Sequence, residues 1–316
     1  MASDTFQIRS TIIQETQEQV AGFILNRATH LIQQQPELMG FLSGSRAGGL
    51  DLGVTRGHTN LDFSSSPDWP LWMSFSGSWS DTGTSEQTYA FGTIGTHRAV
   101  SWNLLLGGML EFDHTKEQNG AGITSGTGWL AGPYLVGTLQ TQPVFYEARL
   151  LYGQSSNTAN PFGTYEDEFD TYRLLASFNM QGRMDLEHFT FIPGVGLSYV
   201  SDDQKAYTDQ LGNPIPGQKV EMGEFNLSLG FEKAIGGGNR STLLSGEVSG
   251  VWSWNDGTGQ VAKLRPAYDG GRARIDFGID HELGPWSSLS ASTFYDGIGA
   301  QGYGSYGINI SFKSAF

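Results

Sequence analysis

The chain has 316 residues, a formal net charge of −14 and a sequence pI near 4.7, a balance that argues against nucleic-acid binding and against a basic membrane-surface role. Cysteine is absent, which excludes disulfides, thiolate metal sites and cysteine nucleophiles. Glycine contributes 44 residues and aromatic side chains 12% of the chain, which favours many strands and turns over helices.

The sequence excludes a transmembrane helix, because no window approaches eighteen consecutive apolar residues. A transmembrane strand needs only about 10 residues, and half of those can be polar, so the membrane itself is not excluded. The start, Met-Ala-Ser-Asp, has neither a basic region nor an apolar region of the kind that a leader needs. We therefore expect that the signal peptide is not present in this chain.

One long helix is predicted from Asp4 to Gln35. Asp4 is a suitable N-cap, and Pro36 supplies the stop. At about 1.5 Å per residue the helix would be about 45 Å long, close to the thickness of a bilayer with its headgroups. Its mixed polarity leaves two interpretations open: a surface helix that packs on a core, or a helix threaded through a polar lumen.

The segment that follows the helix, residues 37–69, is interpreted as a connector. It is rich in Gly, Ser and Asp and contains only short apolar pieces. A short helical turn and a weak strand pair, at Leu50–Val54 and Asn60–Phe63, are the regular structures that we expect in it.

Twelve strands are predicted from Pro70 onward, each with residues that alternate between apolar and polar and each bounded by turn signals. In one of them, Phe225, Leu227 and Leu229 oppose Glu224, Asn226 and Ser228. The predicted strands lie near residues 71–80, 87–96, 99–113, 126–140, 143–154, 169–181, 188–202, 218–233, 241–254, 269–281, 286–295 and 302–316.

The connections between these strands are expected to alternate in length. Short connections are predicted at 97–98, 141–142, 182–187, 234–240 and 282–285, and long polar ones at 113–125, 155–168, 203–217 and 255–268. This alternation is typical of an up-and-down outer-membrane barrel with its turns in the periplasm and its loops outside. The eight tryptophans lie near predicted strand ends and are candidates for interface girdles.

The last strand has the clearest pattern. One face carries Tyr306, Ile308, Ile310, Phe312 and Phe316, and the other carries small or polar residues. A C-terminal strand of alternating apolar residues that ends in Phe resembles the assembly signal of Gram-negative outer-membrane β-barrels.

A mostly polar helix, twelve strands and a terminal Phe together resemble the translocator (β-barrel) domain of classical monomeric autotransporters. Residues 72–79 (WMSFSGSW), 191–199 (FIPGVGLSY) and 223–231 look like three strands of that family in the right order, and the resemblance spans roughly residues 5–316. It implies an all-β membrane protein: a twelve-stranded antiparallel outer-membrane β-barrel with an N-terminal α-helix threaded through the lumen. The implied domains are a pore-spanning helix at 1–36, the connector at 37–69 and the barrel at 70–316.

The resemblance also implies a function. The chain would be an outer-membrane translocator and anchor that carries an N-terminal passenger, expected to be absent here, to the bacterial cell surface. The implied partners are outer-membrane lipid, the barrel-assembly machinery and the passenger, with no nucleic acid, and we expect a monomer. Three alternatives stay open: a porin-like channel with the helix displaced, a surface adhesion barrel acting through its long loops, and a soluble β-sandwich.

Charged side chains on the predicted inner face are the candidate site residues. Strand parity points nine of them inward: Glu111, Glu147, Arg149, Arg173, Glu224, Glu247, Arg272, Arg274 and Asp276. We predict that some pair with helix charges, for which the candidates are Arg9, Glu15, Glu18 and Arg27. An ion pair in a wet lumen is worth only about 0–1 kcal/mol, so such pairs would position the helix more than hold it. The alternative is that the wall charges only solvate the pore.

No catalytic, metal or cofactor site is predicted. The six histidines are scattered without metal-ligand spacing, and no G-x-S-x-G motif is present. The chain is therefore not expected to be an enzyme. A minor alternative is self-cleavage, since some autotransporters cut their passenger at an Asn of the helix with the help of a lumen carboxylate. Here Asn26 precedes Arg27, whereas that pattern is expected to have an Asn-Asn pair.

Overall fold

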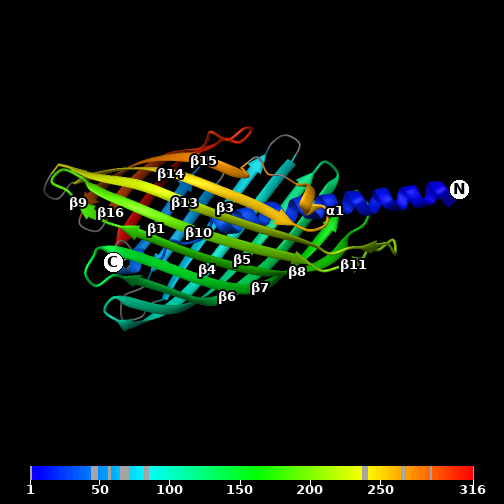
Figure 1. Ribbon diagram of the computed structural model, residues 1–316, viewed down its shortest axis with the longest axis horizontal. Coiled ribbons are helices and arrows are strands. Elements are labelled where there is room, and N and C mark those ends of the chain that lie inside the picture. Colours follow the sequence, from blue (N-terminus) through cyan, green and yellow to red (C-terminus); the bar gives the residue numbers. More distant parts are fainter. Residues whose placement is uncertain are drawn as a thin grey trace.

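Runs of residues with a period of two form twelve long antiparallel strands around one long helix in the computed structural model (Figure 1). The structure describes residues 2–43, 49–55, 58–64, 71–81, 85–236, 241–264, 266, 268–284 and 287–315. The helices are α1 (Ala2–Gln33), the single turn α2 (Gly40–Ser43) and the 3-10 turn η1 (Val261–Lys263). The long strands are β3 (Leu71–Asp81), β4 (Ser85–Ser101), β5 (Leu104–Asn119), β6 (Gly122–Thr138), β7 (Val144–Asn160), β8 (Asp167–Gly182), β10 (Thr190–Gln204), β13 (Gln218–Ile235), β14 (Thr242–Gly257), β15 (Gly270–Gly284), β16 (Ser287–Ile298) and β17 (Ser305–Ala315). The short ones are β1 (Gly49–Thr55), β2 (His58–Ser64), β9 (Met184–Asp185), β11 (Tyr207–Thr208) and β12 (Pro214–Ile215).

The strand pairings form a continuous antiparallel circuit. Consecutive long strands pair with one another, and β10 pairs with both β8 and β13, so the ladder continues past the short strands β11 and β12. The strand pair predicted in the connector is present as β1 and β2, and it pairs with β17 on one side and β3 on the other. The described part of the chain therefore forms an antiparallel β-barrel. The twelve long strands make up most of its wall, and the short strands β1 and β2 complete the wall between β17 and β3. The sequence did not predict that the connector would enter the sheet.

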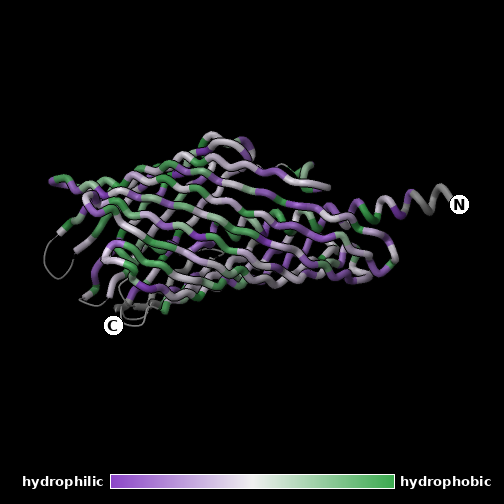
Figure 2. The backbone as a smooth tube through the Cα atoms, turned by 60° about the horizontal axis from the view of Figure 1, so that its bottom comes forward, coloured by the Kyte–Doolittle hydropathy of each residue, from purple (hydrophilic) through white to green (hydrophobic). Residues whose placement is uncertain are grey.

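Side chains alternate between a polar interior and an apolar exterior. On β5, Glu111, Asp113 and Thr115 point inward and are buried, whereas Leu106 and Phe112 are about half exposed on the outside. Figure 2 shows the hydrophobic residues recurring along the strands over the length of the barrel. Monomeric soluble proteins rarely expose apolar surface on this scale, whereas the outer face of a barrel in lipid is expected to be apolar.

None of the described helices is long and apolar enough to span a membrane.

Several strands run further than their hydrophobic pattern predicts. Most of the expected loop at 113–125 is a hairpin, because β5 continues to Asn119 and β6 begins at Gly122; Gly120 turns the chain with φ of +60°. The strands β7 and β8 likewise shorten the loop predicted at 155–168, and the turn predicted at 97–98 lies inside β4. Toward the ends of these strands, outside the part of the barrel with an apolar outer face, the side chains on both faces are polar. The backbone pairing continues there, but no alternation of apolar and polar residues marks it in the sequence.

Trp72 is the one described tryptophan that does not fit the predicted interface girdle. Its side chain points into the lumen and is 1% exposed, and its indole Nε1 donates a hydrogen bond of 2.8 Å to the Tyr134 hydroxyl. Phe41 of α2 packs against Trp72 and against His97. The other described tryptophans are exposed, as expected for a girdle, and Trp69 and Trp286 lie outside the described residues.

Candidate functional site

The candidate site is the lumen, which α1 enters from one end. Figure 1 shows the N-terminal turns of α1 projecting beyond the strands and the rest of the helix lying within them. Gln7, Arg9 and Thr11 are exposed, whereas the apolar residues from Val20 to Leu31 are buried against the wall. The structure therefore agrees with the threaded helix and not with a helix on the outer surface.

A buried ion cluster ties the middle of α1 to one side of the wall. Arg27 donates from Nε to Asp113 Oδ2 at 2.6 Å and from Nη1 to Asn157 Oδ1 at 2.6 Å. Asp113 also accepts from Arg173 Nη1 at 2.5 Å, and Arg173 Nε lies 3.5 Å from Asp202 Oδ2. All four charged side chains are at most 3% exposed, so water screens these pairs much less than it would in an open lumen.

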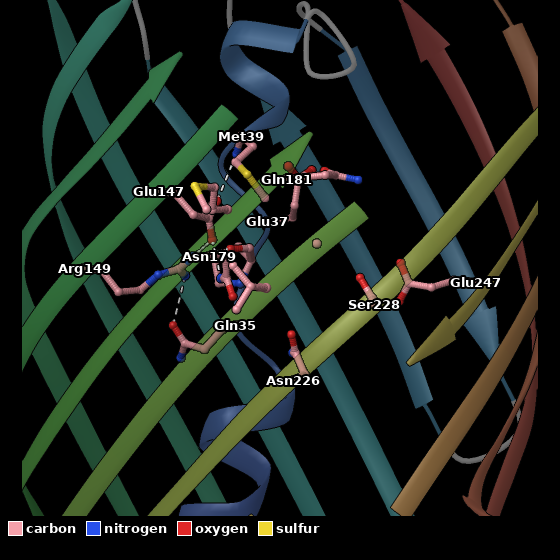
Figure 3. Close-up of a pocket in the computed structure, with 14 residues that line it drawn as sticks. Gln35, Glu37, Met39, Glu147, Arg149, Asn179, Gln181, Asn226, Ser228 and Glu247 are labelled. Carbon is pink, nitrogen blue, oxygen red and sulfur yellow. Dashed lines mark hydrogen bonds and ion pairs between the residues drawn. The ribbon is translucent and has the colours of Figure 1, made fainter. Parts of the chain in front are cut away.

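A second set of contacts holds the segment that follows α1 in the chain, residues 36–39. The Glu147 carboxylate accepts hydrogen bonds from the backbone N–H groups of Leu38 (2.6 Å) and Met39 (2.9 Å), as Figure 3 shows in part. Arg149 donates from Nη2 to Glu147 at 2.5 Å and to the carbonyl of Pro36 at 2.8 Å. This pair of β7 side chains thus binds the backbone of the segment that leaves the helix, through charge-assisted hydrogen bonds.

Gln35 connects this contact on β7 to a carboxylate on β5. Its amide Nε2 donates to Glu111 at 3.2 Å, and its Oε1 accepts from Arg149 at 3.0 Å. Glu111 therefore faces the helix end, as strand parity predicts.

Residues in and beside the β13–β15 connections contact the helix along its length inside the barrel. The amide of Gln218 donates to the Gln17 carbonyl at 3.1 Å, and the hydroxyls of Thr29 and Tyr268 lie 2.7 Å apart. Burial raises the pKa of the Tyr268 phenol, so this group is neutral over the physiological range. Val261 and Leu264 of the β14–β15 connection join the apolar core around the helix.

Asn26 contacts a lumen carboxylate. Its Nδ2 lies 3.2 and 3.3 Å from the two oxygens of Glu117 on β5. About two helical turns before it, Gln19 donates to the Thr124 hydroxyl at 2.8 Å. Within the described residues, no group of three or more His, Asp or Glu side chains is placed to hold a metal ion.

The remaining predicted wall charges lie across the lumen from these contacts and interact with each other. Arg272 is 2.8 Å from Asp296 and 3.0 Å from Glu224, and Arg274 is 2.6 Å from Asp276. A cavity of about 750 Å³ separates this wall from the helix residues Gln33 and His30 and also includes Glu247. Glu224, Glu247, Arg272, Arg274 and Asp276 therefore line the cavity on the wall side, and the ion pairs that they form are with other wall residues.

Within the described residues, three of the four helix charges proposed as partners form no ion pair with the wall. Arg9, Glu15 and Glu18 are exposed, and Glu18 accepts a hydrogen bond from Gln14 of its own helix at 2.7 Å. Only the fourth, Arg27, lies deep enough to meet the wall. Because polar and apolar residues are mixed along the whole helix, the sequence does not show at which residue the helix enters the barrel.

Sequence reasoning missed three wall residues of the Arg27 cluster, namely Asp113, Asn157 and Asp202. The predicted strands ended at residue 113, before residue 157 and at residue 202, so these side chains were assigned to strand ends or loops. Strand parity was the available signal: Asp113 lies two residues after Glu111 and therefore shares its inward face.

The apolar residues of the last strand point away from the lumen. Tyr306, Ile308, Ile310 and Phe312 on β17 are exposed, with Tyr306 at 76%. Phe316, the terminal residue of the predicted signal, lies outside the described residues.

Comparison with known proteins agrees with this architecture. The beta domain of the Bordetella autotransporter BrkA is 17% identical, with 85% of this chain and 100% of that chain covered and a TM-score of 0.50. The NalP translocator domain from Neisseria meningitidis is 13% identical (94% and 95% covered, TM-score 0.49). A deltaS2 mutant of the monoaromatic hydrocarbon channel TodX, a P. putida toluene transporter, is 12% identical (87% and 92% covered, TM-score 0.52). At such identities the likeness to BrkA and TodX shows the fold alone.

Sequence comparison identifies the family. No curated protein matches the chain in sequence. The model of the autotransporter beta-domain matches residues 71–293, which is well over half of the chain. The chain therefore belongs to the autotransporter beta-domain family.

Proposed function

We propose that the chain is the outer-membrane translocator and anchor of an autotransporter, which carries a passenger joined to the N-terminal end of α1 to the cell surface. The observation that carries this proposal is the course of α1 through the lumen, with its first turns exposed beyond the strands. A passenger attached there would lie outside while the barrel stays in the membrane. Residues 1–36 would then act as the pore-spanning helix, 37–69 as the connector and 70–316 as the barrel.

The proposed partners follow from the outer face. Apolar side chains around the barrel would contact outer-membrane lipid. The barrel-assembly machinery would recognise the exposed apolar face of β17 together with Phe316. We propose a monomer, since every strand of the circuit already has a partner on both sides.

The competing functions have less support. A porin-like channel for solutes needs a wide lumen, and α1 runs through this one and narrows it. An adhesion barrel needs long loops, and two of the four predicted long loops are shortened by strand extensions.

Surface display tests the translocator proposal. A reporter domain fused ahead of Ala2 is expected to be digested by protease added to intact cells, because translocation places it outside the outer membrane. The matched control is the same fusion without residues 305–316, which removes β17 and is expected to give no surface reporter. A reporter that stays protected while the barrel is folded and inserted would contradict the proposal.

Self-cleavage is a second candidate that one contact favours. With Glu117 taking a proton from Asn26 Nδ2, that nitrogen could attack the carbonyl carbon of Asn26. The Asn26–Arg27 peptide bond would then break, and the proton would pass to the leaving amine of Arg27. Against this, residue 26 lies in the middle of a regular helix and Arg27 is fixed by Asp113.

We therefore expect the bond after Asn26 to stay intact. Mass spectrometry of a passenger fusion from cells that lack surface proteases should give the uncut chain. A fragment that begins at Arg27, and that disappears in the Glu117→Gln variant, would show cleavage instead.

A further inference from the structure

The helix leaves part of the lumen unfilled. The cavity of about 750 Å³ lies between α1 and the wall from β13 to β17, and two further cavities of about 330 and 230 Å³ adjoin it. Glu247 of β14 lines all three, so the three spaces meet at this side chain. In Figure 3, Glu247 and Ser228 face the pocket from the side opposite Glu147 and Arg149.

Together these cavities extend from the side of the β16–β17 connection to the side of the β8–β10 turn. The largest reaches Tyr303 in the β16–β17 connection and Ser305 at the start of β17, and the smaller ones reach Gln181 and Ile192 beside the β8–β10 turn at the other end. The extra pair β1 and β2 gives a physical reason, since the diameter of a barrel grows with its strand number. A helix about 10–12 Å across fills only part of such a lumen.

The lining of this passage is acidic. Among the described residues, seven carboxylates and three guanidinium groups line the three cavities. Arg272 lies between two carboxylates, and Arg274 pairs with Asp276. Glu247 stands in register with Asp276 on the neighbouring strand, and within the described chain it forms no salt bridge. A narrow cleft lined by excess charge of one sign concentrates the opposite ion.

We propose that the barrel with its helix in place is a narrow passage for hydrated inorganic cations such as K⁺, and that Glu247 sets the preference for cations over anions. At about 30 Å³ per water, the largest cavity has room for about 25 water molecules, enough for an ion with its hydration shell. This activity goes beyond the translocator function, because it needs neither a passenger nor removal of the helix.

The test is the reversal potential of the full chain in planar bilayers under a KCl gradient. We expect a small steady conductance in which K⁺ is more permeant than Cl⁻. Glu247→Gln is expected to lower the K⁺/Cl⁻ permeability ratio about tenfold, because one unit charge at about 6 Å in water favours K⁺ and disfavours Cl⁻ about threefold each, and Glu247→Lys is expected to lower it further. The matched control is Glu168→Gln, whose carboxylate is exposed near the start of β8 and lines none of the three cavities; its ratio should equal that of the unchanged chain.

Three results would overturn the proposal: a preference for Cl⁻, no current from folded and inserted barrel, or an unchanged ratio in Glu247→Gln. Folding of each variant is checked by its heat-dependent gel mobility. Surface display of a reporter is measured in parallel and is expected to be unaffected by these variants, so a failure of the passage is distinguishable from a failure of the translocator function.

Discussion

A chain that starts at Gly44 is expected to conduct about three times as much current per channel as the full chain. The deleted part of α1 that lies in the lumen, from Thr16 to Gln33, would have a length of about 27 Å and a volume of about 2,500 Å³. The three joined cavities beside it measure about 750, 330 and 230 Å³. Removing the helix therefore leaves a lumen with about three times the water-filled volume, and the conductance should rise in proportion.

Single-channel recording in planar bilayers measures this change. The matched control is a chain that starts at Ile12, which loses only helical turns beyond the strands and should conduct like the full chain. Equal and large conductance from the full chain and from the one starting at Gly44 would place α1 outside the pore in the membrane, and it would favour the porin-like channel instead.

Local sequence signals predicted the strands and the wall charges but not the contacts that fix the helix. A period of two is a property of each strand alone, so all twelve long strands were recognisable. The threaded helix was expected only from the family resemblance. Strand parity directs Glu147 inward, but its partners are the backbone N–H groups of Leu38 and Met39, which every residue type except proline carries and which leave no pattern in the sequence.

The pairing partners of the connector strands could not be predicted for the same reason, because they too depend on contacts between distant parts of the chain. Its strand pair was visible as two short alternating runs, but which edges it would join depends on β17 and β3, which are far apart in the sequence. The depth of Arg27 is likewise a property of the assembled barrel, since it depends on where the strands around it end. Pairwise contacts of this kind become predictable only once the register of the sheet is known.

Asp113→Asn is expected to cause the largest loss of stability of any single lumen substitution proposed for this chain. The change leaves Arg27 without its carboxylate partner in a buried site and leaves Arg173 with only the longer contact to Asp202. Removing one partner of a buried ion pair typically costs about 3–5 kcal/mol, because an uncompensated charge remains buried. We expect a lower urea midpoint for barrel unfolding in detergent micelles, and α1 should become accessible: trypsin is expected to cut after Arg27 in the variant and not in the unchanged chain.

The matched control is Asp276→Asn, which makes the same chemical change at another lumen ion pair. Arg274 and Asp276 are each about a third exposed, so solvent screens this pair and its loss should cost only about 0–1 kcal/mol. Adding Arg27→Met to Asp113→Asn should recover part of the lost stability, since the buried cation that lacked a partner is then gone. If the two Asp→Asn variants lose the same stability, or if Arg27 stays resistant to trypsin in Asp113→Asn, then the ion cluster does not hold the helix, and the contacts of Glu147 and of the apolar face of α1 must do so.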